Sequence, residues 1–472
     1  MLSFFRLNDP YRLIVIFFLL VFIRFPFFLG DFPLILPELQ WMLIGEKMSA
    51  GSQLYTELWD DVAPFSATVY WLLDELFGRS PWAYHILGIF LVIFQGYLFN
   101  DLLLRNRAYN QNTYVPAFIY IILMNCFFDF SSLPPVLMSL TFILLAINNI
   151  FKRIDNQTKD EFFLNTGIYL GLATLFYLPC FLFLFSTFLS LLFFTGSIPR
   201  RYLLLVYGLY VPLVLTWFYY YWNNGEVGFS INFLQSPFWL KPNFYVELKT
   251  LAAIIGIPLL YTLLSLWSIN RGSRFVNYQV RLQYAMFFVL VMAGLSFFIT
   301  KDFAPYQLII FVPAMAFFIS HYFLLLKTGI MSEIKFSIFL GLIILINWGS
   351  VYNFFSLETW FNIENMLVKE TKWSAHVKDK RVLLLGDNLH VYKEAQHATP
   401  YLNWQLSQLQ LNYPNYFDNI SDIYQKFSSD MPEIIIDEKQ IAPVLFEKIP
   451  LIGNSYEDTG IPGMYQLKSV GN

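Results

Sequence analysis

Residues 282–299 read LQYAMFFVLVMAGLSFFI, a run without a charged residue that lies between Arg281 and Lys301. A bilayer core about 30 Å thick takes roughly 20 apolar residues as a helix, so this run is long enough to span a membrane. Outward from it we count about eleven such runs, at 11–29, 83–104, 114–128, 134–151, 166–179, 180–195, 202–221, 249–268, 282–299, 306–325 and 336–355. The apolar stretch from Gly167 to Phe194 is too long for one crossing, and we divide it at Leu178-Pro179. The chain is therefore predicted to be an α-helical polytopic membrane protein with about 11 transmembrane helices.

The composition agrees with this class. Of the 472 residues, 57% are hydrophobic and only 13% are charged, about half the charged share of an ordinary soluble domain. The net charge of −3, without a cluster of Lys and Arg, argues against a nucleic-acid-binding protein, because neutralising phosphates needs such a cluster. Cys126 and Cys180 each lie in an apolar run, so we expect neither a disulfide framework nor a thiolate metal site.

Basic residues lie in alternate connections between the apolar runs, which indicates the orientation of the chain. Lys and Arg are retained on the cytoplasmic side. With a cytoplasmic N-terminus, the inner connections hold Arg105, Arg107, Lys152, Arg153, Lys159, Arg200, Arg201, Arg271, Arg274, Arg281, Lys327 and Lys335. No small-residue cleavage site follows the first run before Asp31, so we expect a retained helix. Eleven crossings place the residues after about 356 outside, and we expect the bacterial inner (cytoplasmic) membrane.

The composition changes to that of a soluble domain near Lys372. We therefore expect a membrane domain at 1–371, with a long first outer loop at 30–82, and a small outer-side (periplasmic) α/β domain at 372–472, called the tail. Arg381-Val-Leu-Leu-Leu-Gly-Asp387 and Glu433-Ile-Ile-Ile-Asp437 have the pattern of buried strands that end in turns. Gly386 stands without a glycine-rich continuation, so it indicates packing rather than a phosphate-binding loop.

The first outer loop is too long for a simple connector, and it is the richest in carboxylates. Two stretches, Leu36–Met48 and Ser66–Phe77, have mixed apolar and acidic faces, as helices at a membrane interface do. Such helices would hold four carboxylates near the outer surface, where one could act as a general base: Asp31, Glu38, Asp60 and Asp61. The alternative is that these side chains are only solvated.

Short motifs follow one another in this loop and later in the chain. They are Leu36-Pro37-Glu38-Leu39-Gln40-Trp41, Gly51-Ser52-Gln53-Leu54-Tyr55, Trp59-Asp60-Asp61-Val62-Ala63-Pro64 and Leu76-Phe77-Gly78-Arg79-Ser80, with Lys301-Asp302-Phe303-Ala304-Pro305-Tyr306 farther on. In order and spacing this series resembles the GT-C superfamily of polytopic glycosyltransferases, especially the branch with protein O-mannosyltransferases and lipid A aminoarabinose transferases. The tail is similar to the outer α/β domain of many members.

The resemblance implies transfer of a sugar from a polyprenyl-phosphate carrier to an acceptor on the outer face of the membrane. The family usually has Asp directly before its Glu, whereas Pro37 stands there in this chain. Either Glu38 or Asp31 would then act as the catalytic base. Asp60 and Asp61 are expected to place the acceptor.

The same resemblance, together with charge, suggests residues for the donor phosphate. Lys301 and Tyr306 lie in the late outer loop, and Arg24 lies inside the first apolar run, where a charge is costly unless it faces protein or snorkels to the interface. Cationic side chains near the outer surface suit a departing phosphate. We therefore expect Lys301, Arg24 and Tyr306 to bind the donor phosphate.

Other kinds of site have little support. The histidines, His85, His321, His376, His390 and His397, lack the spacing of a helical zinc site, and no cofactor is expected. His85 is expected to make a packing or polar helix contact. The rival hypothesis is a non-catalytic GT-C-like scaffold, which Pro37 favours, or a transporter component for lipid-linked sugar. The sequence leaves the acceptor and any protein partner open.

The orientation can be tested by labelling. In a variant whose two native cysteines are replaced by serine, a cysteine at Asn472 should react with a membrane-impermeant maleimide in intact cells, because the tail is predicted to lie outside. A cysteine at Arg200 should react only after the membrane is opened. Labelling of the Asn472 position only after opening would reverse the orientation and remove the basis for an outer site.

Overall fold

The computed structural model describes residues 1–29, 33–155, 160–194, 198–272, 275–352, 357–398, 400–413 and 416–468. Each apolar run predicted from the sequence contains a helix: α2 (Arg12–Leu29), α5 (Pro81–Arg105), α6 (Val115–Leu123), α7 (Pro135–Asp155), α8 (Glu161–Phe176), α9 (Phe183–Phe194), α10 (Pro199–Trp222), α13 (Leu248–Gly272), α14 (Asn277–Ile299), α15 (Val312–Leu325) and α16 (Ile330–Tyr352). In the described part of the chain, seven helices are long and apolar enough to cross a membrane. The division at Leu178-Pro179 is confirmed, because α8 ends at Phe176 and a short 3-10 helix, η2 (Leu178–Leu182), precedes α9.

The run at 114–128 differs from a simple span. Its helix, α6, has nine residues and thus a length of about 13 Å, less than half of a bilayer core. Every residue of α6 is buried, and the chain continues as an irregular segment that contains the 3-10 helix η1 (Phe128–Ser131). We call this segment, Met124–Pro134, the α6–α7 connection. The third run is therefore a short helix inside the protein rather than a helix in contact with lipid along its length.

The helices α8 and α10 approach each other at a pair of glycines. A Cβ at Gly167 would overlap the Leu205 carbonyl and lie 2.8 Å from Gly208 Cα, and a Cβ at Gly208 would lie 3.0 Å from Gly167 Cα. Only glycine leaves room for this contact, which is how small residues bring helices together in membranes.

The chain forms two compact units. The first, called the helical unit, comprises Met1–Pro33, Trp82–Thr216 and Pro242–Asn365; the second, called the sheet unit, comprises Leu34–Pro81, Trp217–Lys241 and Met366–Asn472. The sheet unit thus contains most of the first outer loop in addition to the tail. In sequence these two parts are separated by almost 300 residues.

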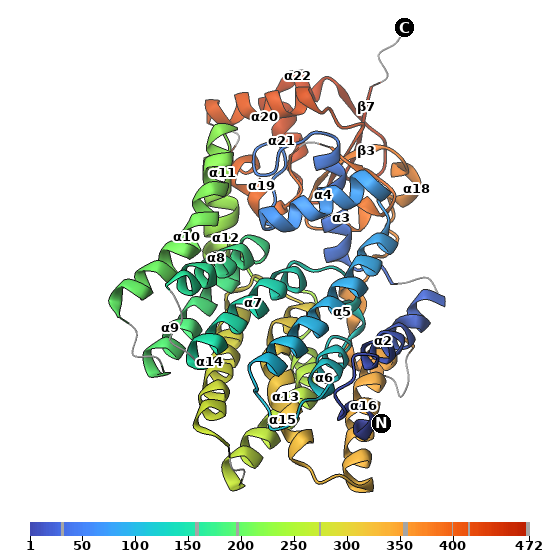
Figure 1. The fold of residues 1–472 in the computed structure, drawn as a ribbon. Helices are drawn as coiled ribbons and strands as arrows, with labels where there is room; N and C mark the ends of the chain where they lie inside the picture. The colour runs from blue at the N-terminus through green and yellow to red at the C-terminus, as the bar shows by residue number, and fades with distance from the viewer. Residues whose placement is uncertain are drawn as a thin grey trace. The chain divides into compact units, whose positions relative to one another are not determined.

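A five-stranded sheet organises the tail, as the strand patterns predicted (Figure 1). Its strands are β3 (Arg381–Leu385), β4 (Gln396–His397), β5 (Ile434–Asp437), β6 (Tyr456–Asp458) and β7 (Met464–Leu467), in the order β4-β3-β5-β7-β6. β3 runs parallel to β4 and β5, whereas β7 is antiparallel to β5 and β6. Leu383 and Ile435 of the sheet join an apolar core with helices α19 (Trp404–Leu411), α20 (Phe417–Ser429) and α21 (Ala442–Lys448). This small α/β fold agrees with the predicted class.

The outer loop is joined to the tail by backbone hydrogen bonds and by packing. Trp59 N donates to Pro400 O (2.7 Å), and Asn403 N donates to Trp59 O (3.0 Å). The indole of Trp59 packs edge-on against Tyr401, with ring centroids 5.5 Å apart, and Lys426 Nζ lies 4.0 Å from its centroid. The turn at Trp59 is therefore part of the core of the sheet unit.

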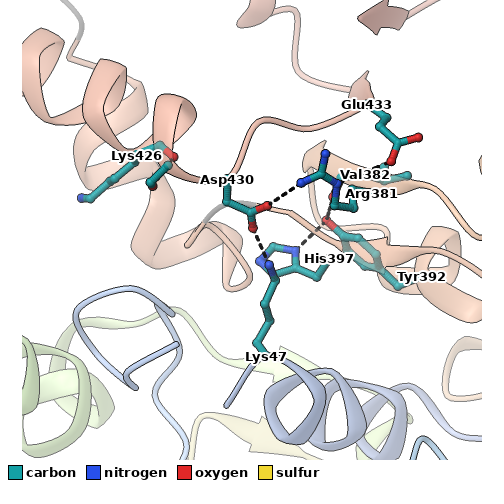
Figure 2. A network of polar contacts seen from close by, with 9 residues as sticks. Lys47, Arg381, Val382, Tyr392, His397, Lys426, Asp430 and Glu433 are labelled. Atoms are coloured by element: carbon teal, nitrogen blue, oxygen red, sulfur yellow. Dashed lines mark hydrogen bonds and ion pairs between the residues drawn. The ribbon is translucent and has the colours of Figure 1, made fainter. Parts of the chain in front are cut away.

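Charged groups fasten the two helices of the loop, α3 (Leu36–Ser49) and α4 (Pro64–Phe77), to the same tail. Asp430, just after α20, accepts from Lys47 of α3 and from Arg381 Nη1 of β3 (3.5 Å) (Figure 2). Arg79, two residues after α4, donates to the Ala395 carbonyl (2.9 Å) and to that of Tyr392. Loop and tail therefore fold as one body.

Replacing Trp59 with alanine should loosen both parts together. Loss of a partly buried indole should cost about 2–3 kcal/mol, and hydrogen exchange should rise in residues 53–61 and 400–411 alike. Trp222→Ala is the matched control, because Trp222 is 86% exposed in the same unit, and it should change stability by less than about 0.5 kcal/mol. Faster exchange confined to the loop would show that the tail folds without it.

Candidate functional site

Glu38 lies in the first turn of α3. The helix begins after Ile35 and has a proline, Pro37, at its second position, where a missing N–H costs nothing and the fixed φ suits a helix. Proline in place of aspartate thus leaves the helix start intact. Glu38 itself is fully buried, with 0% exposed.

Burial makes the Glu38 carboxyl a weaker acid than a solvated glutamate. Removal from water disfavours the charged form and raises the pKa of Glu38 to about 8. A helix N-terminus favours negative charge, but here the effect of burial is larger. A carboxyl that titrates near neutral pH can accept and return a proton, which a solvated glutamate does poorly.

Asp60 and Asp61 fix the turn that follows. Asp60 is 1% exposed; its Oδ2 accepts from Gln40 Nε2 of α3 (2.6 Å), and its Oδ1 accepts from Val62 N (2.9 Å). Asp61 Oδ1 accepts from Asn403 Nδ2 of the tail (3.0 Å). Asp60 therefore ties the turn to the helix that carries Glu38, and Asp61 ties it to the tail. The fourth predicted carboxylate, Asp31, lies outside the described residues.

Lys301 and Tyr306 occupy the connection between α14 and α15 in the helical unit. The short strands β1 (Asn243–Phe244) and β2 (Asp302–Phe303) pair here in parallel. Asn243 N donates to Lys301 O (2.7 Å), and the rings of Phe244 and Phe303 stack 4.8 Å apart. The backbone at Lys301 and directly after it is thereby held in place.

Tyr306 is held by a residue that the sequence reasoning missed. Asp129, 1% exposed in the α6–α7 connection, accepts from Tyr306 N through Oδ2 (2.8 Å). The available signal was a lone carboxylate between phenylalanines, Phe127-Phe-Asp-Phe130, in an apolar run, because ionisable residues in such runs are commonly functional.

Arg24 contacts the same connection from α2. It is 1% exposed, so it faces protein rather than the interface. Its Nε donates to Asn125 Oδ1 (2.9 Å), its Nη2 donates to Phe130 O (3.2 Å), and its Nη1 has no hydrogen-bond partner among the described residues. His85 also reaches the connection, with Nδ1 3.1 Å from Ser131 O, which is the polar helix contact expected for it.

The predicted residues therefore form two sets. Glu38, Asp60 and Asp61 belong to the sheet unit, and Lys301, Tyr306 and Arg24 belong to the helical unit. Within the second set, Arg24 and Tyr306 are joined through the α6–α7 connection. In the described parts of the chain, no group of three His, Cys, Asp or Glu side chains is arranged to hold a metal ion.

Comparison with known proteins finds solved structures with a similar fold but no matching sequence. No protein-family model and no characterised protein sequence matches the chain. The structure is similar to ArnT from Cupriavidus metallidurans bound to undecaprenyl phosphate, at 16% identity and a TM-score of 0.48, over 70% of this chain and 64% of that chain. It is also similar to the Archaeoglobus fulgidus oligosaccharyltransferase in the apo form, at 9% identity and a TM-score of 0.48, over 95% of this chain and 73% of that chain.

At this level of likeness the GT-C resemblance of the motifs stays a prediction. The chain spans less than two thirds of the ArnT chain that it matches. At such identities, and with TM-scores below 0.5, function has to be inferred from the residues themselves.

The raised pKa of Glu38 predicts a pH-dependent stability. Because the folded protein holds this proton up to about pH 8 and the unfolded chain releases it near pH 4.5, burial of Glu38 should destabilise the protein progressively as pH rises between these values. Glu38→Gln removes the titrating carboxyl. The melting temperature of the variant minus that of the wild type should therefore be larger at pH 9 than at pH 5. Glu75→Gln, at an exposed site on α4, should show no such trend. An equal difference at both pH values would mean that Glu38 titrates normally.

Proposed function

We propose that the protein is a membrane glycosyltransferase that moves a sugar from a polyprenyl-phosphate carrier to an acceptor on the outer face of the membrane. The observation that carries this proposal is the buried Glu38 carboxyl, whose pKa of about 8 suits proton transfer at neutral pH. Its position in the acidic motif of the loop adds the expected sequence context.

In the proposed reaction, Glu38 accepts the proton of an acceptor hydroxyl while the hydroxyl oxygen attacks the anomeric carbon of the sugar. The bond between that carbon and the phosphate oxygen breaks, and the electron pair leaves with the polyprenyl phosphate. Asp31 is the alternative base if the acceptor approaches from the start of the loop. Asp60 and Asp61 act on acceptor placement by fixing the turn beside α3.

The leaving phosphate gains negative charge, which cationic and hydroxyl donors stabilise. We assign this role to Lys301, Tyr306 and Arg24. Arg24 contacts the α6–α7 connection through its guanidinium and Tyr306 contacts it through its backbone N–H, so the connection holds both residues in place. The chemistry assigned to these residues needs no metal ion or organic cofactor.

The proposed setting is the bacterial inner membrane, with the N-terminus in the cytoplasm and the tail outside. The alternation of basic connections supports this orientation. It puts the loop and the tail, which fold together, on the side where the acceptor is proposed to be.

The alternative is a non-catalytic scaffold with the same fold, or a component that transports lipid-linked sugar. Two observations favour a scaffold: Pro37 replaces the usual aspartate, and the Asp60 carboxylate is occupied by Gln40 and Val62. A carboxyl buried only for packing would also have a raised pKa. Catalysis and scaffolding therefore have to be separated by experiment.

The test for catalysis uses the purified full chain in nanodiscs with a panel of undecaprenyl-phosphate-linked hexoses and periplasmic glycans as acceptors, with release of undecaprenyl phosphate as the readout. Glu38→Gln should lower transfer about 10²- to 10⁴-fold, because the amide cannot accept the proton. Asp31→Asn should do so if that residue is the base. The rate of the wild type should rise with pH towards about 8 as Glu38 ionises.

Donor binding is measured separately, with undecaprenyl phosphate as the probe. Lys301→Ala should weaken binding about tenfold, as expected for the loss of one charge-assisted contact, while Glu38→Gln should leave it unchanged. Glu75→Gln and Lys241→Ala, both at exposed positions, are the controls and should match the wild type. Full transfer in both Glu38→Gln and Asp31→Asn, or no binding of undecaprenyl phosphate, would support the scaffold.

A further inference from the structure

A cavity lies within the tail, at the carboxyl end of strand β5. It has a volume of about 660 Å³ and is lined by residues from three segments, 372–373, 437–443 and 462–465. β5 runs parallel to β3, and in open α/β sheets ligands bind outside the carboxyl ends of parallel strands. None of the residues proposed for glycosyl transfer lines this cavity.

Asp437 makes the floor of the cavity rigid. Its Oδ1 accepts from Lys439 N and Ile441 N (both 3.1 Å), and its Oδ2 accepts from Ala442 N (2.8 Å), so the carboxylate is used to cap α21. Its own N–H donates to Gly463 O (2.7 Å), so two of the residues that line the cavity are hydrogen-bonded to each other. The turn that follows holds Gln440 at a φ of 58°, a left-handed conformation that is uncommon for a residue other than glycine.

Glu438 lies beside Gly386 at the end of β3, where the glycine leaves room for the glutamate side chain. A Cβ at residue 386 would overlap Glu438 Oε2 and lie 3.0 Å from Glu438 Cβ. The Glu438 N–H also donates to Leu385 O (3.1 Å), and Lys439 Nζ pairs with Asp387 Oδ2 (2.9 Å). The lone glycine of the Arg381–Asp387 motif thus sets the position of a carboxylate that lines the cavity.

Trp373 contributes an unsatisfied donor. It is 5% exposed and lines the cavity, and its Nε1–H has no acceptor in the part of the chain that the structure describes. A buried donor without a partner is costly and usually has water or a ligand beside it. Lys372 Nζ lies 4.4 Å from the centroid of the Trp373 ring, so the face of the indole already holds a cation.

We infer that this cavity binds a neutral saccharide. Glu438 and Gln440 offer acceptors for hydroxyl groups, Trp373 offers a donor, and the partly exposed ring of Tyr465 can cover the apolar face of a pyranose. The carboxylate of Glu438 disfavours a phosphate or other anion. A cationic ligand would have to displace Lys372 from the indole face.

The experiment measures binding of maltotriose and of triacetylchitotriose to the full chain in nanodiscs by saturation-transfer difference NMR, without any lipid-linked donor. Glu438→Ala and Tyr465→Ala should each weaken binding at least fivefold. Gly386→Ala should weaken it similarly, because the new methyl group displaces the Glu438 carboxylate although residue 386 does not line the cavity. Glu447→Ala and Tyr416→Ala, at exposed sites on the same tail, should bind as the wild type does.

Inorganic phosphate and choline are run as competing probes. Binding of either one, but of neither saccharide, would overturn the inference, as would saccharide binding that all three cavity variants retain. Tyr465 packs against Phe446, so each variant is first checked by its melting temperature, and Glu438→Ala decides the case if Tyr465→Ala is unstable. Glu38→Gln should keep saccharide binding, which separates this inference from the proposed transfer activity.

Discussion

The stability of the helical unit depends on hydrogen bonds to the backbone N–H and C=O groups that have no helical partner where helix α6 ends. Inside a membrane protein an irregular segment is tolerated only if the protein itself supplies hydrogen-bond partners. Arg24 supplies them for the carbonyls of Met124 and Phe130, and Asn347 Nδ2 donates to Asn125 O (2.7 Å). A buried guanidinium is costly, so the α6–α7 connection and Arg24 stabilise each other.

The same connection links this structural role to the proposed chemistry. Asp129 lies two residues after Phe127 and holds the backbone of Tyr306, while Phe130, next to it, accepts from Arg24. Any displacement of the connection would therefore move residues from two distant parts of the sequence at once. An enzyme gains from such coupling, because donor-binding groups must keep a fixed geometry during transfer.

In the sheet unit, burial rather than charge pairing sets the properties of the candidate base. Helices α3 and α4, the turn at Trp59 and the tail belong to one compact unit, and Glu38 of α3 is fully buried. The tail is thus more than an appended domain. It provides hydrogen-bond acceptors for the side chains of Lys47 and Arg79 of the loop, and its Asn403 donates a hydrogen bond to Asp61. Its own cavity, beside Asp437 and Glu438, lies at a separate edge of the sheet.

The sequence by itself determined the class of the protein, the position of the apolar helices, the break at Leu178-Pro179 and the α/β nature of the tail. These features depend on local composition and periodicity, which a single segment displays without its neighbours. The acidic motif of the loop could also be found, because its residues are close together in the chain. Only the tertiary structure decided four other features. They are the burial of Glu38, the contact of Asp129 with Tyr306, the short length of α6 and the packing of the loop against the tail. Each of them results from contacts between residues far apart in sequence, and desolvation depends on the whole surroundings of a group rather than on its neighbours along the chain.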